Sequence, residues 1–136
     1  MNAGLGRGSG PGRGRFVVLQ HDWNGVHWDF MLEAGEGLRT WAVDAPIVPG
    51  VPLAARLLPD HRRIYLTFEG PISGDRGCVR RVAEGVFQTI EWRVDHVRVQ
   101  LSGAQLVGEV DLYRSPSGTD SKGGSTTWTF LLGKVD

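Results

Sequence analysis

The sequence predicts an all-β fold, a closed or partly open antiparallel β-barrel of about eight strands with little helix. Three observations lead to this prediction. Short runs rich in valine, isoleucine, threonine and aromatic residues recur along the chain, as strands prefer. Glycine, proline, asparagine and aspartate separate these runs, and many short strands at such spacing are typical of barrels and sandwiches. Only Pro52–Leu58 has even a briefly helical pattern.

The expected elements begin after a tail. Residues 1–15 are rich in glycine, carry three arginines and offer almost nothing to bury. We therefore expect a disordered tail followed by a barrel domain over residues 16–136. Ser115–Ser125 is expected to form a surface loop because serine, glycine and aspartate predominate in it. The strands that we expect in the barrel domain are Phe16–Asp22, Val26–Glu33, Leu38–Val43, His61–Phe68, Cys78–Val82, Val86–Arg93, His96–Ser102, Gln105–Arg114 and Thr126–Val135.

Length and composition exclude several classes of protein. A chain of 136 residues fits one domain. No apolar run approaches the roughly 20 residues that a membrane helix needs, and the N-terminus has no apolar segment of the signal-peptide kind. Cys78 is the single cysteine and cannot form an internal disulfide, which favours a reducing compartment. We expect a cytoplasmic protein that has no membrane partner and is a monomer.

The charge pattern bears on nucleic-acid binding. A net charge of zero argues against a long, nonspecific grip on DNA but is compatible with a local basic groove. The cations are nearly all arginine, with Lys122 and Lys134 as the exceptions. Arginine suits bidentate phosphate contacts, but a genome-wide codon bias gives the same excess of arginine, so the composition alone does not indicate a phosphate ligand.

Two of the expected strands have different residues on their two faces. For Val26–Glu33 the faces consist of Val26, Trp28, Phe30 and Leu32, and of His27, Asp29, Met31 and Glu33. For His61–Phe68 they consist of Arg62, Ile64, Leu66 and Phe68, and of His61, Arg63, Tyr65 and Thr67. Each strand is therefore expected to turn an apolar face to the core and a polar face away from it.

The segment HDWNGVHWD contains two histidines and an aspartate, His21, His27 and Asp29. Two imidazoles and one carboxylate can hold zinc, manganese or iron and leave positions open for substrate. A two-residue Asn24–Gly25 loop would pair His21 with Trp28 and turn it away from His27. A three-residue loop that ends on the glycine pairs His21 with His27 instead. Both registers pair apolar residues on the core face, so burial does not choose between them, whereas a metal site requires the second.

Several segments of the chain together resemble one known family. The stretch FVVLQHDWNGVHWDFMLEAGEGLRTWAV contains a histidine-aspartate pair, a short turn, a histidine-aromatic-aspartate-phenylalanine motif and a Trp-Ala-Val strand. This pattern resembles the opening of the 3′-phosphoesterase module of bacterial ligase D. The later segments that are similar to this family are His61–Tyr65, Phe68–Gly70, Leu106–Leu112 and Trp128–Leu132.

This resemblance implies a barrel with a metal-dependent active site in a surface groove. The implied activity removes a 3′ ribonucleoside or a 3′ phosphate from strand ends, with manganese preferred. It makes His21, His27 and Asp29 the ligands of Mn²⁺, or of another divalent ion such as Zn²⁺ or Co²⁺. It makes His61 and Tyr65 the groups that contact the scissile phosphate. The implied partners are DNA or RNA–DNA 3′ ends at the nucleoid, beside a DNA ligase or polymerase of an end-joining system.

The sequence departs from the family pattern in its phosphate-binding residues. An arginine, a glutamate and a lysine of the family are replaced here by Met31, Pro59 and the segment Asp44–Pro46. Part of the family's phosphate clamp is therefore missing or moved. Arg63, which shares the expected strand face with His61, is a candidate replacement, and Arg39 is a second candidate.

Two alternative functions fit some of the same residues. His27 and Asp29 could join a distant histidine in the two-histidine, one-carboxylate triad of non-haem iron oxygenases. His61 and His96 are the candidates for that histidine, but this function leaves His21 unexplained. The second alternative is a non-catalytic module that binds DNA ends or a repair protein, which the departures in the phosphate clamp favour.

Overall fold

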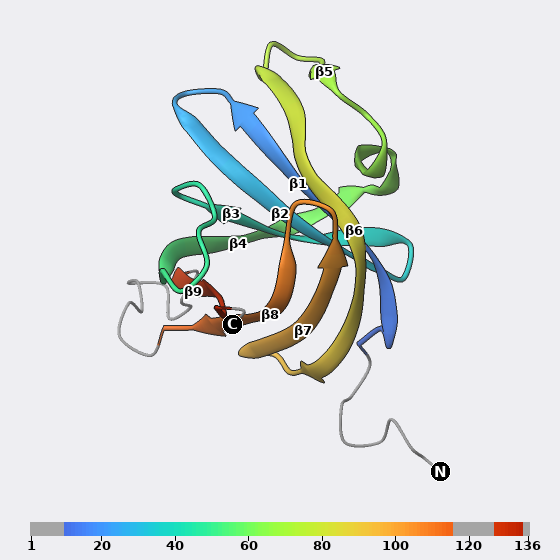
Figure 1. Ribbon diagram of the computed structural model, residues 1–136. Coiled ribbons are helices and arrows are strands. Elements are labelled where there is room, and N and C mark those ends of the chain that lie inside the picture. Colours follow the sequence, from blue (N-terminus) through green and yellow to red (C-terminus); the bar gives the residue numbers. More distant parts are fainter. Residues whose placement is uncertain (1–9, 116–126, 135–136) are drawn as a thin grey trace.

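A computed structural model describes residues 10–115 and 127–134 of the chain, and in these ranges the molecule is a β-barrel (Figure 1). No helix in these ranges is long and apolar enough to cross a membrane. In chain order the elements are β1 (Arg13–Asp22), β2 (Val26–Ala34), β3 (Gly37–Val43), β4 (Leu53–Arg62), the 3₁₀ segment η2 (Arg63–Leu66), β5 (Gly70–Pro71), β6 (Cys78–Trp92), β7 (His96–Gly103), β8 (Val107–Arg114) and β9 (Thr127–Leu132).

The barrel closes where β6 pairs with β1. Antiparallel neighbours follow the order β1-β2-β3-β4-β9-β8-β7-β6, and the additional β1–β6 pairing joins the two ends of this row. Each of these strands therefore has a hydrogen-bonded neighbour on both sides. The short strand β5 pairs with the first residues of β6, on the edge of β6 opposite to β1. The predicted all-β barrel with little helix is confirmed.

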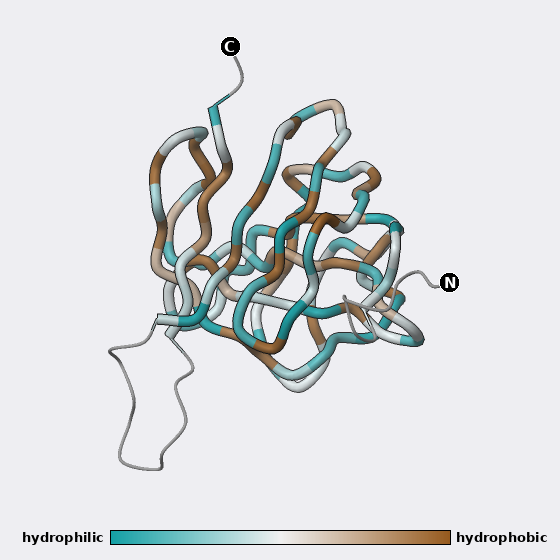
Figure 2. Tube along the Cα trace, turned by 90° about the horizontal axis from the view of Figure 1, so that it is seen from below, coloured by the Kyte–Doolittle hydropathy of each residue, from teal (hydrophilic) through white to brown (hydrophobic). Residues whose placement is uncertain are grey.

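Large apolar side chains fill the barrel interior. Phe16, Phe30, Trp41, Trp128 and Phe130 are all fully buried there. The rings of Phe30 and Phe130 meet edge to face with their centroids 5.1 Å apart, a favourable geometry for aromatic pairs. Apolar and polar residues alternate along several strands (Figure 2), as expected when successive side chains point to opposite sides of a sheet. Because the interior is packed, a binding site has to lie on the outside.

A second, smaller core lies on the outer side of the sheet. Its buried residues are Val17, Leu19, Met31, Leu38, Leu66 and Val79. Leu66 belongs to η2, and the nearby side chains of Tyr65, Phe68 and Ile72 pack against the same cluster. Residues 63–77 therefore cover part of the outer surface of β1–β3 (Figure 1). The β2 face that we expected to be polar is partly apolar, because Met31 is buried in this second core.

The structure differs most from the sequence prediction over residues 52–68. Pro52–Leu58, expected to be helical, lies largely in β4, because pairing with β3 and β9 outweighs its local helical preference. The strand expected over His61–Phe68 is also wrong. β4 ends at Arg62 and η2 follows it. Alternation over so few residues does not distinguish a strand from a tight turn that buries Leu66.

The bounds of β1 and β6 also differ from the expected ones. β1 begins at Arg13, so the last residues of the expected tail pair with β6. The strands expected over Cys78–Val82 and Val86–Arg93 form one continuous strand, β6. This strand pairs with β1 over its first part and with β7 over its second. Gly85 permits the close approach of β6 to β7, since a Cβ there would lie 2.4 Å from the carbonyl oxygen of Ser102. Residues 1–9 of the expected tail, and the expected loop beyond Ser115, lie outside the described residues.

Candidate metal centre

The β1–β2 hairpin sets the positions of the candidate metal ligands. Its loop contains the three residues Trp23–Gly25, and His21 pairs directly with His27. Asn24 and Gly25 have positive φ angles of 54° and 102°, which asparagine and glycine adopt more readily than other residues. The three-residue register that a metal site requires is therefore the one that forms.

The three candidate ligands converge beside this loop. Ligand atoms of His21, His27 and Asp29 all lie within 4.8 Å of one another. His27 Nε2 is 3.0 Å from Asp29 Oδ1, and His21 Nδ1 is 3.4 Å from Asp29 Oδ2. The Asp29 side chain is almost fully buried, and both imidazoles are largely buried. The group is therefore a compact set of donors at the base of the hairpin loop.

A backbone carbonyl orients one of the histidines. His21 Nε2 lies 2.9 Å from the carbonyl oxygen of Arg76. Because a carbonyl can only accept, Nε2 must carry the proton and donate it. In the neutral imidazole Nδ1 then keeps its lone pair, and Nδ1 is the atom that faces Asp29. Metal-binding histidines are commonly held in one tautomer by such an outer hydrogen bond.

The carboxylate of Asp29 provides a separate indication of a cation site. Its Oδ1 is buried and accepts no hydrogen bond from the described residues. The 3.0 Å approach of His27 Nε2 is an ion-pair distance without hydrogen-bond alignment. A buried anionic oxygen without a donor is costly, and a divalent ion would remove that cost. Two imidazoles and a carboxylate are suitable ligands for such an ion and leave coordination positions open.

His61 and Tyr65 lie close to each other. His61 is near the end of β4 and Tyr65 is in η2, and their ring centroids are 5.9 Å apart. His61 Nδ1 lies 2.9 Å from the carbonyl oxygen of Pro59. By the same reasoning Nδ1 donates to this carbonyl, and Nε2 is available to another group. The turn of η2, rather than an extended strand, brings the two side chains together.

A groove of about 660 Å³ connects these residues on the outside of the barrel. Its lining includes the three candidate metal ligands together with Trp23, His61 and Tyr65. Three arginines also line it, Arg56, Arg62 and Arg76. The side chains of Arg56 and Arg62 have no hydrogen bond or ion pair with any residue in the two described ranges. Although the whole chain is neutral, this groove therefore offers cationic groups to an anionic ligand.

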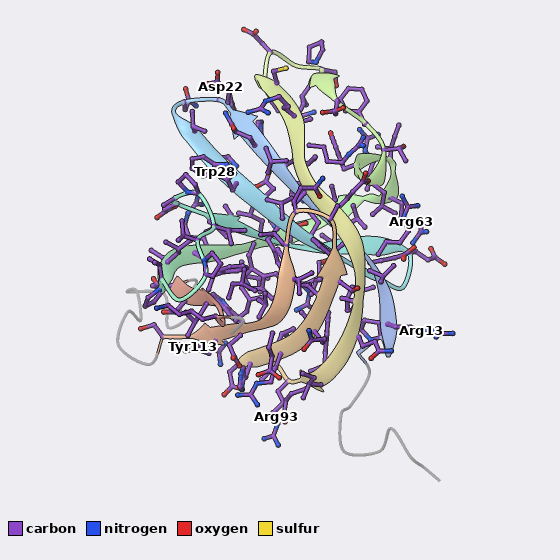
Figure 3. The ribbon with its side chains drawn as sticks, viewed as in Figure 1. Arg13, Asp22, Trp28, Arg63, Arg93 and Tyr113 are labelled. Atoms are coloured by element: carbon purple, nitrogen blue, oxygen red, sulfur yellow. The ribbon has the colours of Figure 1, made fainter. Side chains whose placement is uncertain are left out.

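The arginines predicted from the sequence lie elsewhere. Arg63 forms an ion pair with Glu33, because η2 replaces the strand face that would have placed it beside His61. Arg39 Nε is 3.6 Å from Asp60 Oδ1, and its guanidinium lies 5.6 Å from the ring centre of Trp92. Neither Arg63 nor Arg39 is among the residues that line the groove. Figure 3 shows the Arg63 side chain pointing away from the barrel.

Sequence reasoning missed the three arginines that do line the groove. Arg56 fell in the run expected to be helical, Arg62 fell on an expected apolar face, and Arg76 precedes Gly77 in a turn without a motif. The predominance of arginine over lysine was the available signal for phosphate binding. It could not select individual residues, because their positions depend on how the segment after β4 folds over the barrel.

Two of the departures from the expected phosphate clamp also line the groove. Met31 is 1% exposed, so an apolar side chain stands where an arginine was expected. Pro59 lies in a bulge of β4, where the register with β3 shifts between Leu38 and Thr40. Proline is tolerated at such a bulge because one ladder hydrogen bond is already absent there. Beyond the bulge β4 continues to His61, which pairs with Leu38 of β3.

His96 takes part in a different cluster. Its Nε2 is 2.8 Å from Asp111 Oδ1, which also accepts a hydrogen bond from Arg98. In the described part of the chain, His21 completes the group with His27 and Asp29. The triad that the oxygenase alternative builds with His61 or His96 is therefore not the one that forms.

Comparison with known proteins identifies relatives of the chain. The family model described as "DNA Ligase D 3′-phosphoesterase domain" matches residues 19–114. The multifunctional non-homologous end joining DNA repair protein LigD of Mycobacterium tuberculosis (strain H37Rv) is 33% identical over 109 residues, which cover 74% of this chain and 14% of that protein. The multifunctional non-homologous end joining protein LigD of Pseudomonas aeruginosa is 29% identical over 130 residues, which cover 88% of this chain and 15% of that protein. The chain thus spans only a small part of the length of these relatives.

Proposed function

The chain belongs to the DNA ligase D 3′-phosphoesterase domain family, and we propose that it is a metal-dependent phosphoesterase for 3′ ends of DNA or RNA–DNA in end-joining repair. The observation that carries this proposal is the convergence of His21, His27 and Asp29 in a groove lined by arginines. A cation site beside cationic side chains suits a phosphate, which needs several positive groups at once. The proposed reaction releases a 3′ phosphate or a 3′ ribonucleotide.

The candidate ligands define where an ion would act. His21 Nδ1, His27 Nε2 and the Asp29 carboxylate would hold it, and Mn²⁺ is the ion that we propose, with Zn²⁺ or Co²⁺ as alternatives. Such an ion supplies positive charge that neutralises a phosphate oxygen and lowers the pKa of a water molecule. The Arg76 carbonyl contributes by holding His21 in the tautomer that this requires.

His61 and Tyr65 are the proposed phosphate-contacting groups. The Pro59 carbonyl fixes His61 through Nδ1, so its Nε2 is the atom that can donate to a phosphate oxygen or protonate the leaving oxygen. The edge-to-face contact between the two rings limits the orientation of Tyr65. We propose that the Tyr65 hydroxyl orients the phosphate, while His61 stabilises its charge during the reaction.

Arg56 and Arg62 are the proposed substitutes for the missing clamp. Both line the groove without an ion-pair partner among the described residues, so their guanidinium groups are available to phosphate oxygens. Arg76 also lines it, and its Nε donates to the Ser73 carbonyl. These three replace Arg63 and Arg39 as the arginines that we expect to bind substrate.

A non-catalytic end-binding module is the second candidate. Met31 favours it, because a buried thioether cannot donate a hydrogen bond to a phosphate. This candidate predicts binding of 3′ ends by the same groove without any product. A DNA ligase or polymerase that processes the same ends at the nucleoid would be the partner in either case.

The test is a cleavage assay with labelled duplexes that end in a 3′ phosphate or a single 3′ ribonucleotide, with and without Mn²⁺. We expect product with the wild type, none with His27→Ala, and a rate lowered about 10²–10³-fold by His61→Ala. His96→Gln is the control, because this histidine lies in a separate cluster, and it should retain wild-type activity. No product from any of the folded proteins, together with a gel shift of the same ends, would replace the enzyme by the end-binding module.

A further inference from the structure

A large aromatic side chain stands exposed at the rim of the groove. Trp23 is 41% exposed although it is a tryptophan, and it lines the groove next to the candidate metal ligands. We propose that Trp23 is a stacking platform for the base of the nucleotide at the 3′ end. This inference rests on the proposed function, since it names how the same site holds an unpaired nucleobase beside the phosphate that is cleaved.

The orientation of Trp23 relative to the candidate metal centre supports this role. Its ring stacks on that of His21, with centroids 5.9 Å apart and an angle of 22° between the planes. One face of the indole is therefore directed to a candidate ligand, and the exposure of the ring leaves surface for another planar group. A base placed there lies within one nucleotide of the ion site, which is where the terminal base has to be.

The loop that carries Trp23 is held in one conformation. The Trp23 N–H donates to the Gly25 carbonyl at 2.8 Å, and Asn24 and Gly25 adopt the positive φ angles that close the turn. Gly77 packs against the loop from the other side. A Cβ on Gly77 would lie 2.1 Å from the Asp22 carbonyl oxygen and 2.6 Å from the Trp23 Cβ. A platform that is ordered before the ligand arrives loses less conformational entropy on binding.

The charges in the groove match the backbone that such a base would bring. The guanidinium groups of Arg56 and Arg62 have no hydrogen-bond or ion-pair partner among the described residues, and together with Arg76 these residues line the groove that Trp23 borders. Aromatic side chains beside cationic groups are the usual means of binding single-stranded nucleic acid. Because every base has a π-face, stacking on Trp23 should select for the presence of a base and only weakly for its identity.

The experiment compares two otherwise identical duplexes with an unpaired 3′ nucleotide, one with its base and one with an abasic tetrahydrofuran residue. Binding is measured by fluorescence anisotropy in EDTA, so that neither hydrolysis nor an ion contributes. For the wild type we expect the base to strengthen binding about 5- to 150-fold in Kd. Trp23→Ala should lose this difference and bind both duplexes with the Kd of the abasic one. Trp23→Phe should recover most of it.

Tyr113→Ala is the matched control, because Tyr113 is also an exposed aromatic residue but lies at the other end of the molecule from Asp22 and the hairpin loop (Figure 3). It should keep the wild-type preference for the base. Equal Kd values of the two duplexes for the wild type, or a preference that survives Trp23→Ala, would overturn the inference. In that case, product from 3′-phosphate or 3′-ribonucleotide ends in the separate assay with Mn²⁺ would leave the proposed function standing. A base preference in EDTA, together with no product in the Mn²⁺ assay, would instead support Trp23 and refute the phosphoesterase.

Discussion

Replacing Phe30 with alanine is the most direct test of how the two faces of β2 are used. Phe30 is fully buried, and its ring centroid lies 6.3 Å from that of Phe16, 6.4 Å from that of Trp41 and 5.1 Å from that of Phe130. The substitution removes a ring surrounded by other rings that cannot all collapse into the space. We expect the free energy of unfolding to fall by about 3–5 kcal/mol. Domains of this kind are stable by only about 5–15 kcal/mol, so the effect is large.

The neighbouring positions on the outer face provide the comparison. His27 points to the candidate metal centre, and the apo protein should lose less than about 1 kcal/mol in His27→Ala, since this substitution removes little apolar contact. Met31 is also on the outer face but is packed in the second core. Met31→Ala should therefore cost about 2–5 kcal/mol. The order of the three losses in unfolding free energy distinguishes a buried outer cluster at Met31 from a solvated strand face.

The assay is urea denaturation followed by circular dichroism, with EDTA present so that no ion contributes to stability. Equal slopes against urea would show that the three variants expose similar surface on unfolding. If Phe30→Ala leaves too little folded protein, Phe30→Leu measures the same site with a smaller loss. A loss in His27→Ala as large as that in Phe30→Ala would show that the faces of β2 have been assigned wrongly.

Three further predictions concern the ion, the groove and acid stability. Mn²⁺ at about 100 times its Kd should stabilise the wild type by about 2.7 kcal/mol in a thermal melt and should not stabilise His27→Ala; an equal gain in both proteins would contradict the site. Met31→Arg should raise the rate of 3′ phosphate removal by up to about 10²–10³-fold, at some cost in stability because Met31 is buried; a folded variant with unchanged turnover would refute this role. Burial opposes ionisation of Asp111, but hydrogen bonds from Arg98 and His96 outweigh it and lower the pKa of this carboxyl below 3.8. The stabilisation by the ionised Asp111 carboxylate is therefore present above that pH and is lost as the pH falls through the lowered pKa. Asp111→Asn should lower the free energy of unfolding at pH 7 and should make it fall less on acidification. Parallel curves of unfolding free energy against pH for the two proteins would show that the cluster contributes nothing.

Local patterns carried most of the barrel prediction. The strands around His27, Trp41 and Val99 have strong alternation or β-branched and aromatic content, and they form where expected. The sequence left two registers possible for the hairpin. One of them could be linked to a metal site, because Asn24 and Gly25 suit a three-residue loop. Structure that depends on residues close together in the sequence could be predicted, because few alternative conformations are available to such short segments.

The residues that line the groove could not be predicted from local patterns. It depends on the chain after β4 turning back over the outer face, where Arg81 donates from its side chain to the Thr67 carbonyl and from its backbone to Glu69. The hydrogen bond that orients His21 is accepted by the backbone carbonyl of Arg76, 55 residues further along the chain. Leu58 to Leu66 has no pattern that distinguishes a bulge and a 3₁₀ turn from a second strand. Tertiary packing, rather than local preference, decides such a segment.

The three side chains that converge on the candidate ion all belong to one hairpin, residues 21–29. Their mutual contacts have very low contact order, so they can form as soon as this hairpin closes, on a timescale of microseconds. The groups that make the site a groove come instead from distant parts of the chain, His61 beside Leu38 in the strand ladder and Arg76 behind His21. Convergence of the three side chains and assembly of the groove are therefore expected to depend on different parts of the chain. Loosening the segment after β4 would open the groove and release His21 from the Arg76 carbonyl, but it would leave the pairing of His21 with His27, which belongs to the hairpin alone.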